Sequence, residues 1–132
     1  AFLEDIASKF GTYSPLEIKQ IYTTWIVRLF LKSKPVLSKP HRVADLIEFN
    51  YLLGHEAIYF DGDNKLHIRF EKIAPVMYRL LEETIDVQLS KSLNKAKAFV
   101  DKWSDWSDIM DYIARIQKNI GVRPYIRLIT KF

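Results

Sequence analysis

Residues 41–58 read HRVADLIEFNYLLGHEAI, and this stretch decides the fold that we expect. Pro40 stands just before it, at a position that prolines favour in the first turn of a helix, and Gly54 is a plausible stop signal. Between them, apolar side chains recur at intervals of three and four residues. The positions that form this face are Val43, Leu46, Ile47, Asn50, Tyr51 and Leu53. The stretch therefore predicts a helix with one face turned toward a core.

The residues after this helix have the pattern of a β-hairpin. Residues 57–60 (AIYF) and 66–70 (LHIRF) are short runs rich in β-branched and aromatic side chains, and residues 61–64 (DGDN) favour a turn between them. Calcium binding is an alternative for this acidic turn, but the regular ligand spacing and the closing glutamate of a calcium loop are absent. A hairpin of two strands is marginal in water, so we expect it to pack against the helices.

Helical patterns occupy most of the remaining chain. Ser14, Pro15 and Glu17 have the signature of a capping box and predict a helix that reaches about Ser33. Helical spacing of apolar residues also recurs over residues 2–10, 73–88, 93–103 and 108–119, and an extended tail follows at residues 122–129. The prediction is a single, mainly α-helical domain over residues 1–132, with five to six packed helices, one small β-hairpin and an extended C-terminal tail.

The composition limits the classes of function. The 132 residues include 48% hydrophobic residues and no cysteine, which indicates a globular domain without disulfides, thiolate metal sites or a cysteine nucleophile. No apolar run reaches the roughly 18 residues of a membrane span and no signal-peptide pattern is present, so we expect a cytoplasmic location and no membrane partner. The formal charge of +4 is mild and scattered, and it does not favour nucleic acid as a partner.

The three histidines do not form a zinc motif. A catalytic zinc commonly takes three protein ligands, and two of them are often histidines four residues apart on a helix. His55 and Glu56 are the only adjacent histidine–glutamate pair, and no second histidine follows at the required spacing. His67 falls in a predicted strand. We therefore expect no metal ligand and no cofactor-binding residue in this chain.

His41 has a position that physical chemistry links to catalysis. It follows Pro40 at the start of a predicted helix, where backbone N–H groups and the helix dipole disfavour positive charge. A neutral imidazole there could donate a hydrogen bond to a developing oxyanion. The alternative is a first-turn histidine that is exposed or caps the helix, and the residues alone favour this alternative.

A second candidate surface lies near the end of the chain. Trp103 and Trp106, with three lysines close by, could stack on the bases and bind the phosphates of single-stranded nucleic acid. The helical spacing of Trp103 from Phe99 favours a core position instead, with the lysines on a solvated face.

Five segments resemble, in the right order, the C-terminal region of the dipeptidyl peptidase III family of zinc metallopeptidases. The likeness runs from about Ser14 to the C-terminus, and in the helix that carries His41 it is greatest for the bacterial branch and for plant proteins with a Nudix domain in front. The segments are IYTTWIVRLFLKS, HRVADLIEFNYLLGHEAI, DGDNKLHIRFEKI, LEETIDVQLSKSLNKAKAFVDKW and GVRPYIRL.

The resemblance implies a part of a zinc-dependent exopeptidase that removes dipeptides from the N-termini of peptides. The zinc ligands of the family would lie upstream of Ala1, so this chain by itself is expected to lack zinc and to be inactive. In the family, the histidine that matches His41 reaches into the cleft, where it binds substrate or stabilises the transition state. The implied partners are the remainder of the parent polypeptide and a peptide substrate.

The chain departs from the family pattern at several positions. Lys39 and Pro40 stand where the family usually has an acidic residue and an alanine. Asp45 and Asn50 stand in the part of the helix where the animal and fungal enzymes carry arginines. These differences bear on the charge contacts to substrate and on the dipeptidyl specificity.

Two functions thus remain open at the level of sequence. The first is the C-terminal part of a zinc peptidase, which predicts exposed apolar surface where the rest of the enzyme would pack. The second is a free-standing helical module that binds protein or nucleic acid, which predicts a closed core and a defined groove or basic face.

Overall fold

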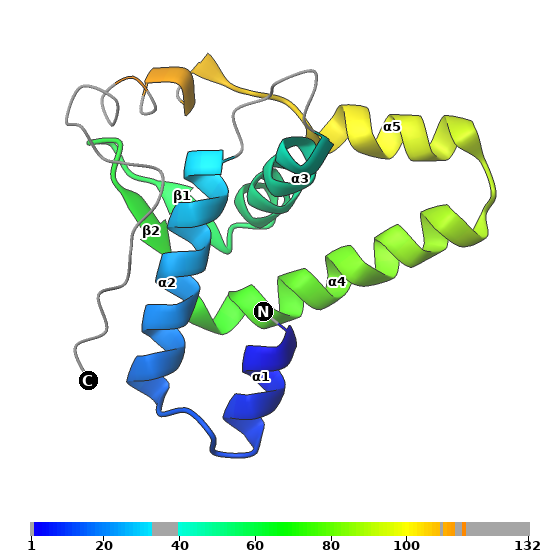
Figure 1. The fold of residues 1–132 in the computed structure, drawn as a ribbon. Helices are drawn as coiled ribbons and strands as arrows, with labels where there is room; N and C mark the ends of the chain where they lie inside the picture. Colours follow the sequence, from blue (N-terminus) through cyan, green and yellow to red (C-terminus); the bar gives the residue numbers. More distant parts are fainter. Residues whose placement is uncertain (1, 33–39, 109, 113–114, 116–132) are drawn as a thin grey trace.

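The computed structural model describes residues 2–32, 40–108, 110–112 and 115. Its elements are the helices α1 (Phe2–Lys9), α2 (Pro15–Lys32), α3 (Pro40–Gly54), α4 (Phe70–Leu89) and α5 (Leu93–Trp103), and the strands β1 (Ile58–Phe60) and β2 (Leu66–Ile68) (Figure 1). The prediction of a mainly α-helical fold with one small β-hairpin is confirmed. Most of the helix expected over residues 108–119, and the whole tail expected over residues 122–129, lie outside the described residues.

Helix α2 begins with the capping box that its sequence predicts. The backbone N–H of Ser14 donates to Glu17 Oε2 at 2.6 Å, and the backbone N–H of Glu17 donates to Ser14 Oγ at 3.2 Å. These bonds satisfy N–H groups that the start of a helix otherwise leaves free, while Pro15 has no N–H to satisfy. The bond from the Ser14 backbone also holds the pKa of Glu17 below its ordinary value.

Helix α3 lies at the centre of the fold. It packs against α2, α4, α5 and β1, and Leu46, Phe49, Tyr51 and Leu52 are fully buried. The single apolar face that the sequence predicts is therefore incomplete, because Phe49 and Leu52 lie outside it. Neighbouring elements surround α3 on several sides, so the buried surface is wider than one stripe.

The two strands pair antiparallel, with Tyr59 opposite His67. The carboxylate of Asp61 closes the predicted turn by accepting hydrogen bonds from two backbone N–H groups, at 2.8 and 3.0 Å. Ile58 is fully buried and anchors the hairpin to the core, as expected for a pair of strands that is marginal alone. Both strands are shorter than predicted: β1 begins at Ile58 and not at Ala57, and β2 ends at Ile68 because the chain turns into α4 at Phe70.

Helix α4 begins at Phe70, whereas the apolar spacing predicts a start at Ile73. Phe70 packs against the core from the helix, and the N–H of Lys72 donates to the carbonyl of Arg69 at 3.0 Å. As a result Pro75 lies inside the helix and not in its first turn. A proline there removes one backbone hydrogen bond, a loss that the complete burial of Ile73 helps to offset.

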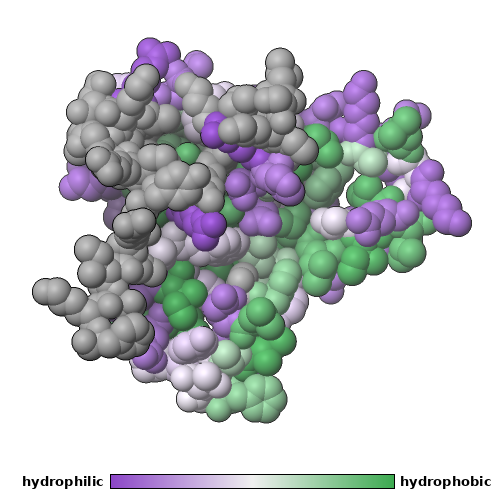
Figure 2. Space-filling view, viewed as in Figure 1, coloured by the Kyte–Doolittle hydropathy of each residue, from purple (hydrophilic) through white to green (hydrophobic). Residues whose placement is uncertain are grey.

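Residues 81–103, the outer half of α4 together with α5, form an arm that extends away from the other helices (Figure 1). Ser92 caps α5 by accepting a hydrogen bond from the backbone N–H of Lys95 at 3.3 Å. The far end of α5 returns to α3, where the rings of Trp103 and Tyr51 lie 4.7 Å apart between centroids. Apolar residues gather on the surface over the outer part of α4 (Figure 2).

Gly54 allows α3 to end closely against α5. A Cβ atom at Gly54 would lie 2.7 Å from Cζ3 of Trp103, which is too close for a relaxed contact. The Trp103 ring cannot move aside freely, because it also contacts the rings of Tyr51 and His55. The absence of a side chain at Gly54 is therefore a condition of this packing.

Gly54→Ala should lower the free energy of unfolding by about 1–3 kcal/mol, because the added methyl group forces the Trp103 ring out of its packing. Urea unfolding followed by tryptophan fluorescence measures this loss. Gly62→Ala is the matched control, since nothing lies within 4 Å of an added methyl group there. Equal stability of the two variants would show that the contact with Trp103 imposes no constraint.

Candidate functional site

His41 is the second residue of α3, and its side chain is exposed. Side chains three and four residues apart share one face of a helix, so His41 shares a face with Asp45 and, one turn further on, with Glu48. Asp45 and Glu48 line a hollow of about 270 Å³ between α3 and α2, which we call the α2–α3 groove. Its other wall comes from α2 and consists of Trp25, Arg28 and Leu29.

The α2–α3 groove brings charged groups of both signs together. Burial, with the neighbouring carboxylate of Asp45, raises the pKa of Glu48. The guanidinium of Arg28 lines the same hollow from the opposite helix. Two carboxyl groups thus lie along the α3 face that begins at the exposed imidazole of His41, and one guanidinium lies opposite them on α2. Such a set can accept hydrogen bonds from peptide N–H groups and donate them to carbonyl groups.

A second hollow, of about 460 Å³, lies along α2. Trp25 and Arg28 line both hollows, so the two are neighbours. The remaining residues of the second hollow are Tyr13, Glu17, Gln20, Ile21 and Thr24. Volumes of this order lie in the range of pockets that bind small ligands.

His55 lies near the other end of α3, roughly 20 Å from His41 at the rise of an α-helix. Its imidazole contacts the rings of Tyr51 and Trp103, with centroids 4.3 and 5.7 Å away. Burial, with the nearby guanidinium of Arg79, lowers the pKa of His55. The neutral ring is therefore favoured, and its Nε2 atom is buried without a hydrogen-bond partner among the described residues.

His67 lies on the hairpin, as predicted, with its Nε2 atom 2.6 Å from Oδ2 of Asp61. The bond from His67, together with the backbone N–H of Lys65, lowers the pKa of Asp61 to about 2. The three histidines thus occupy three separate parts of the fold. Within the described ranges, no group of three or more His, Asp or Glu side chains is arranged to hold a metal ion, so these residues do not fit a zinc site.

The two tryptophans near the end of the chain are packed. Trp103 lies against the core, as its spacing predicts, and the ammonium of Lys102 lies 4.9 Å from the centroid of its ring. Trp106 stacks on Phe30, with ring centroids 6.2 Å apart. Both tryptophans are half-buried, and each ring has another aromatic ring against it.

Asn50 has a structural contact in place of the arginine that the family resemblance places in this part of the helix. Its Nδ2 atom donates to the carbonyl of Trp103 at 2.9 Å and to the carbonyl of Asp105 at 2.6 Å. These bonds satisfy two carbonyl groups at the end of α5. Asn50 therefore fastens α5 to α3 and is not part of the α2–α3 groove.

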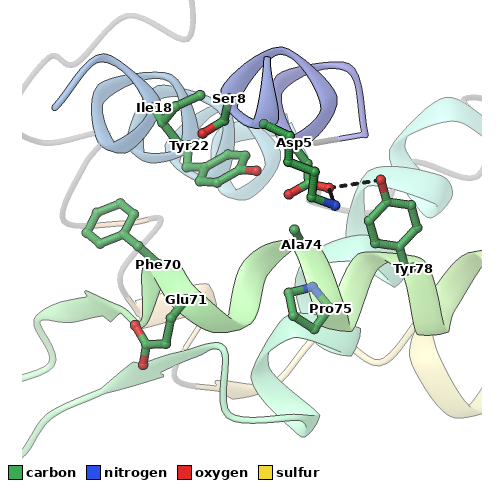
Figure 3. Close-up of a pocket in the computed structure, with 10 residues that line it drawn as sticks. Asp5, Ser8, Ile18, Tyr22, Phe70, Glu71, Ala74, Pro75 and Tyr78 are labelled. Carbon is green, nitrogen blue, oxygen red and sulfur yellow. Dashed lines mark hydrogen bonds and ion pairs between the residues drawn. The ribbon is translucent and has the colours of Figure 1, made fainter. Parts of the chain in front are cut away.

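A further pocket, of about 400 Å³, lies between α1, α2 and α4 (Figure 3). The carboxylate of Asp5 accepts hydrogen bonds from Lys9 Nζ at 2.8 Å and from Tyr78 Oη at 3.0 Å. The bond from Lys9, with the one from Tyr78, lowers the pKa of Asp5. These polar groups bind one another across the two helices, which indicates that they hold α1 on α4.

Sequence reasoning identifies His41 but not the groove beside it. The i, i+4, i+7 spacing of His41, Asp45 and Glu48 on one predicted helix is a signal that could have found the acidic side of the groove. Trp25 and Arg28 carry no such signal. Only the packing of α2 on α3 brings their side chains to the same hollow as the carboxyl groups.

Comparison with known proteins places the fold. No family model matches the sequence, and no curated protein matches it. Among solved structures, the fold is similar to that of DPP III from Caldithrix abyssi, with a TM-score of 0.77 over 89% of this chain and 23% sequence identity. The chain spans 22% of the length of that protein. The described helices include none with the length and apolar character of a membrane span.

The free energy of unfolding should fall as the pH is lowered through the ordinary pKa of histidine, near 6.5. The unfolded chain binds a proton at His55 there, whereas the folded chain binds it only at lower pH. His55→Phe keeps the aromatic packing and removes this titration, so its unfolding temperature should change less between about pH 8 and about pH 5. Thermal unfolding followed by circular dichroism measures both proteins, and parallel curves would contradict a lowered pKa of His55.

Proposed function

We propose that this chain is the C-terminal part of a zinc-dependent peptidase that removes dipeptides from the N-termini of peptides. The observation that carries the proposal is the similarity of its fold, over 89% of the chain, to part of a structure of DPP III. The sequence segments that resemble the same family, in the same order, support it. A unit that spans 22% of the similar protein fits a portion of a larger enzyme.

In this proposal His41 contributes to the substrate cleft. Its imidazole is exposed in the first turn of α3, on the helix face that continues into the α2–α3 groove. An N–H of the ring can donate a hydrogen bond to the peptide carbonyl oxygen that becomes negative in the tetrahedral transition state. The N-terminal end of α3 adds a partial positive charge that favours the same oxygen.

The zinc would be held by residues of the remaining polypeptide, because the described residues of this chain do not fit a metal site. When bound, zinc supplies Lewis-acid chemistry at the scissile peptide bond. We therefore expect residues 1–132 alone to have no peptidase activity, and we expect the remainder of the polypeptide to be their partner.

His41→Ala in the full-length peptidase should lower kcat by about a hundredfold, the typical loss when one donor to an oxyanion is removed, while the zinc content stays the same. Hydrolysis of a chromogenic dipeptidyl substrate gives the rate, and metal analysis gives the zinc content. His67→Ala is the matched control and should keep its activity, since His67 pairs with Asp61 on the hairpin. Unchanged turnover of the His41 variant would remove this residue from the mechanism.

A free-standing module that binds another protein is the second candidate function, and the defined α2–α3 groove, with carboxyl groups and a guanidinium in its lining, favours it. The exposed apolar side chains at the tip of the arm, such as Leu89 at 73% and Leu93 at 83% exposure, favour the peptidase portion instead. The gene separates the two functions. A reading frame that extends through a helix with zinc ligands supports the peptidase, whereas a frame that encodes only these residues leaves the interaction module.

A further inference from the structure

The arm carries a line of exposed apolar side chains on α4. Leu81, Ile85 and Leu89 lie four residues apart, so they follow one side of the helix over successive turns. Their side chains are 41%, 43% and 73% exposed. Scattered exposed leucines are ordinary on a protein surface, but a continuous line of them marks a contact surface. We call these three residues the arm stripe.

The arm stripe continues, at the same four-residue spacing, the line of α4 residues that begins with Ile73 and Met77. Both of these side chains are buried in the core, whereas those of the stripe are exposed. Farther toward the start of α4, the side that continues into the stripe is already covered, because the ring of Phe2 packs on the ring of Tyr78 with centroids 5.0 Å apart. The covered part ends one helical turn before Leu81. The stripe thus extends a surface that α1 covers only in part.

Charges border the stripe on its solvent side. Glu82 and Asp86 are exposed, and each follows a stripe residue directly along α4. A segment that covers the stripe would therefore meet apolar side chains next to two carboxylates. The chemistry that complements this surface is an apolar face with lysine or arginine along one edge.

We propose that the arm stripe is the surface through which this chain packs against the remainder of the longer polypeptide, by an apolar segment bordered by basic residues. The inference rests on the proposed function, in which the chain is one portion of an enzyme. The similar solved protein supports it, since the unit equivalent to this chain is 22% of its length, which leaves a larger portion for the stripe to contact.

The test is the double substitution Ile85→Gln and Leu89→Gln, made in residues 1–132 and in the full-length polypeptide. In residues 1–132 the unfolding temperature should change little, because the side chains of Ile85 and Leu89 are 43% and 73% exposed and glutamine favours helix. In the full-length polypeptide it should fall by about 4 °C or more, because apolar contacts across the interface are lost. The matched control is Asn94→Gln with Ala98→Gln, at two exposed positions of α5. It should leave the unfolding temperature unchanged both in residues 1–132 and in the full-length polypeptide.

An unchanged unfolding temperature of the full-length double variant would overturn the inference. A second outcome would also overturn it. If sedimentation shows that residues 1–132 form a dimer and that the double variant does not, the stripe binds a second copy of this chain. The readout requires neither zinc nor hydrolysis. If the double variant is destabilised and the unsubstituted full-length protein has no peptidase activity, the proposed function is refuted and the interface is kept. If the unsubstituted full-length protein is active and the double variant is as stable as it, the interface alone is refuted.

Discussion

The packing of α2 on α3 is the contact on which the other features of the structure depend. Ile26, Leu46 and Phe49 are fully buried, and each such side chain contributes roughly 1.5–3 kcal/mol when it leaves water. Phe30 extends the same layer, since its ring contacts that of Phe49. This contact aligns the two helices, and the α2–α3 groove is formed by their outer edges. The first turn of α3, with His41, is held beside that groove.

The opposite end of α3 is held by polar and aromatic contacts. The hydroxyl of Tyr51 donates to Glu83 of α4, and burial, with this bond, raises the pKa of Tyr51 so that the hydroxyl stays a donor. Trp103 joins the same junction from α5, next to His55. The indole N–H of Trp103 and Nε2 of His55 are both buried there without partners among the described residues.

The two ends of α3 therefore have different roles. One end presents His41 beside a groove with carboxyl groups and a guanidinium, and the other end anchors the arm whose outer surface is apolar. Under the proposed function, the first end would belong to the substrate cleft, and the arm would contact the remaining polypeptide.

Local chemistry in the sequence determined the helix starts at Ser14 and Ser92, the turn after residue 60, and the place of His41 in the first turn of a helix. Hydrogen bonds that span two to four residues set the two helix starts and the turn, and Pro40 favours the first turn of a helix, so a short segment contains each cause. Tertiary structure alone decided that Phe49 is buried and that Trp25 shares a hollow with Glu48. Burial and shared hollows depend on which elements meet, and those elements are brought together by contacts between residues far apart along the chain.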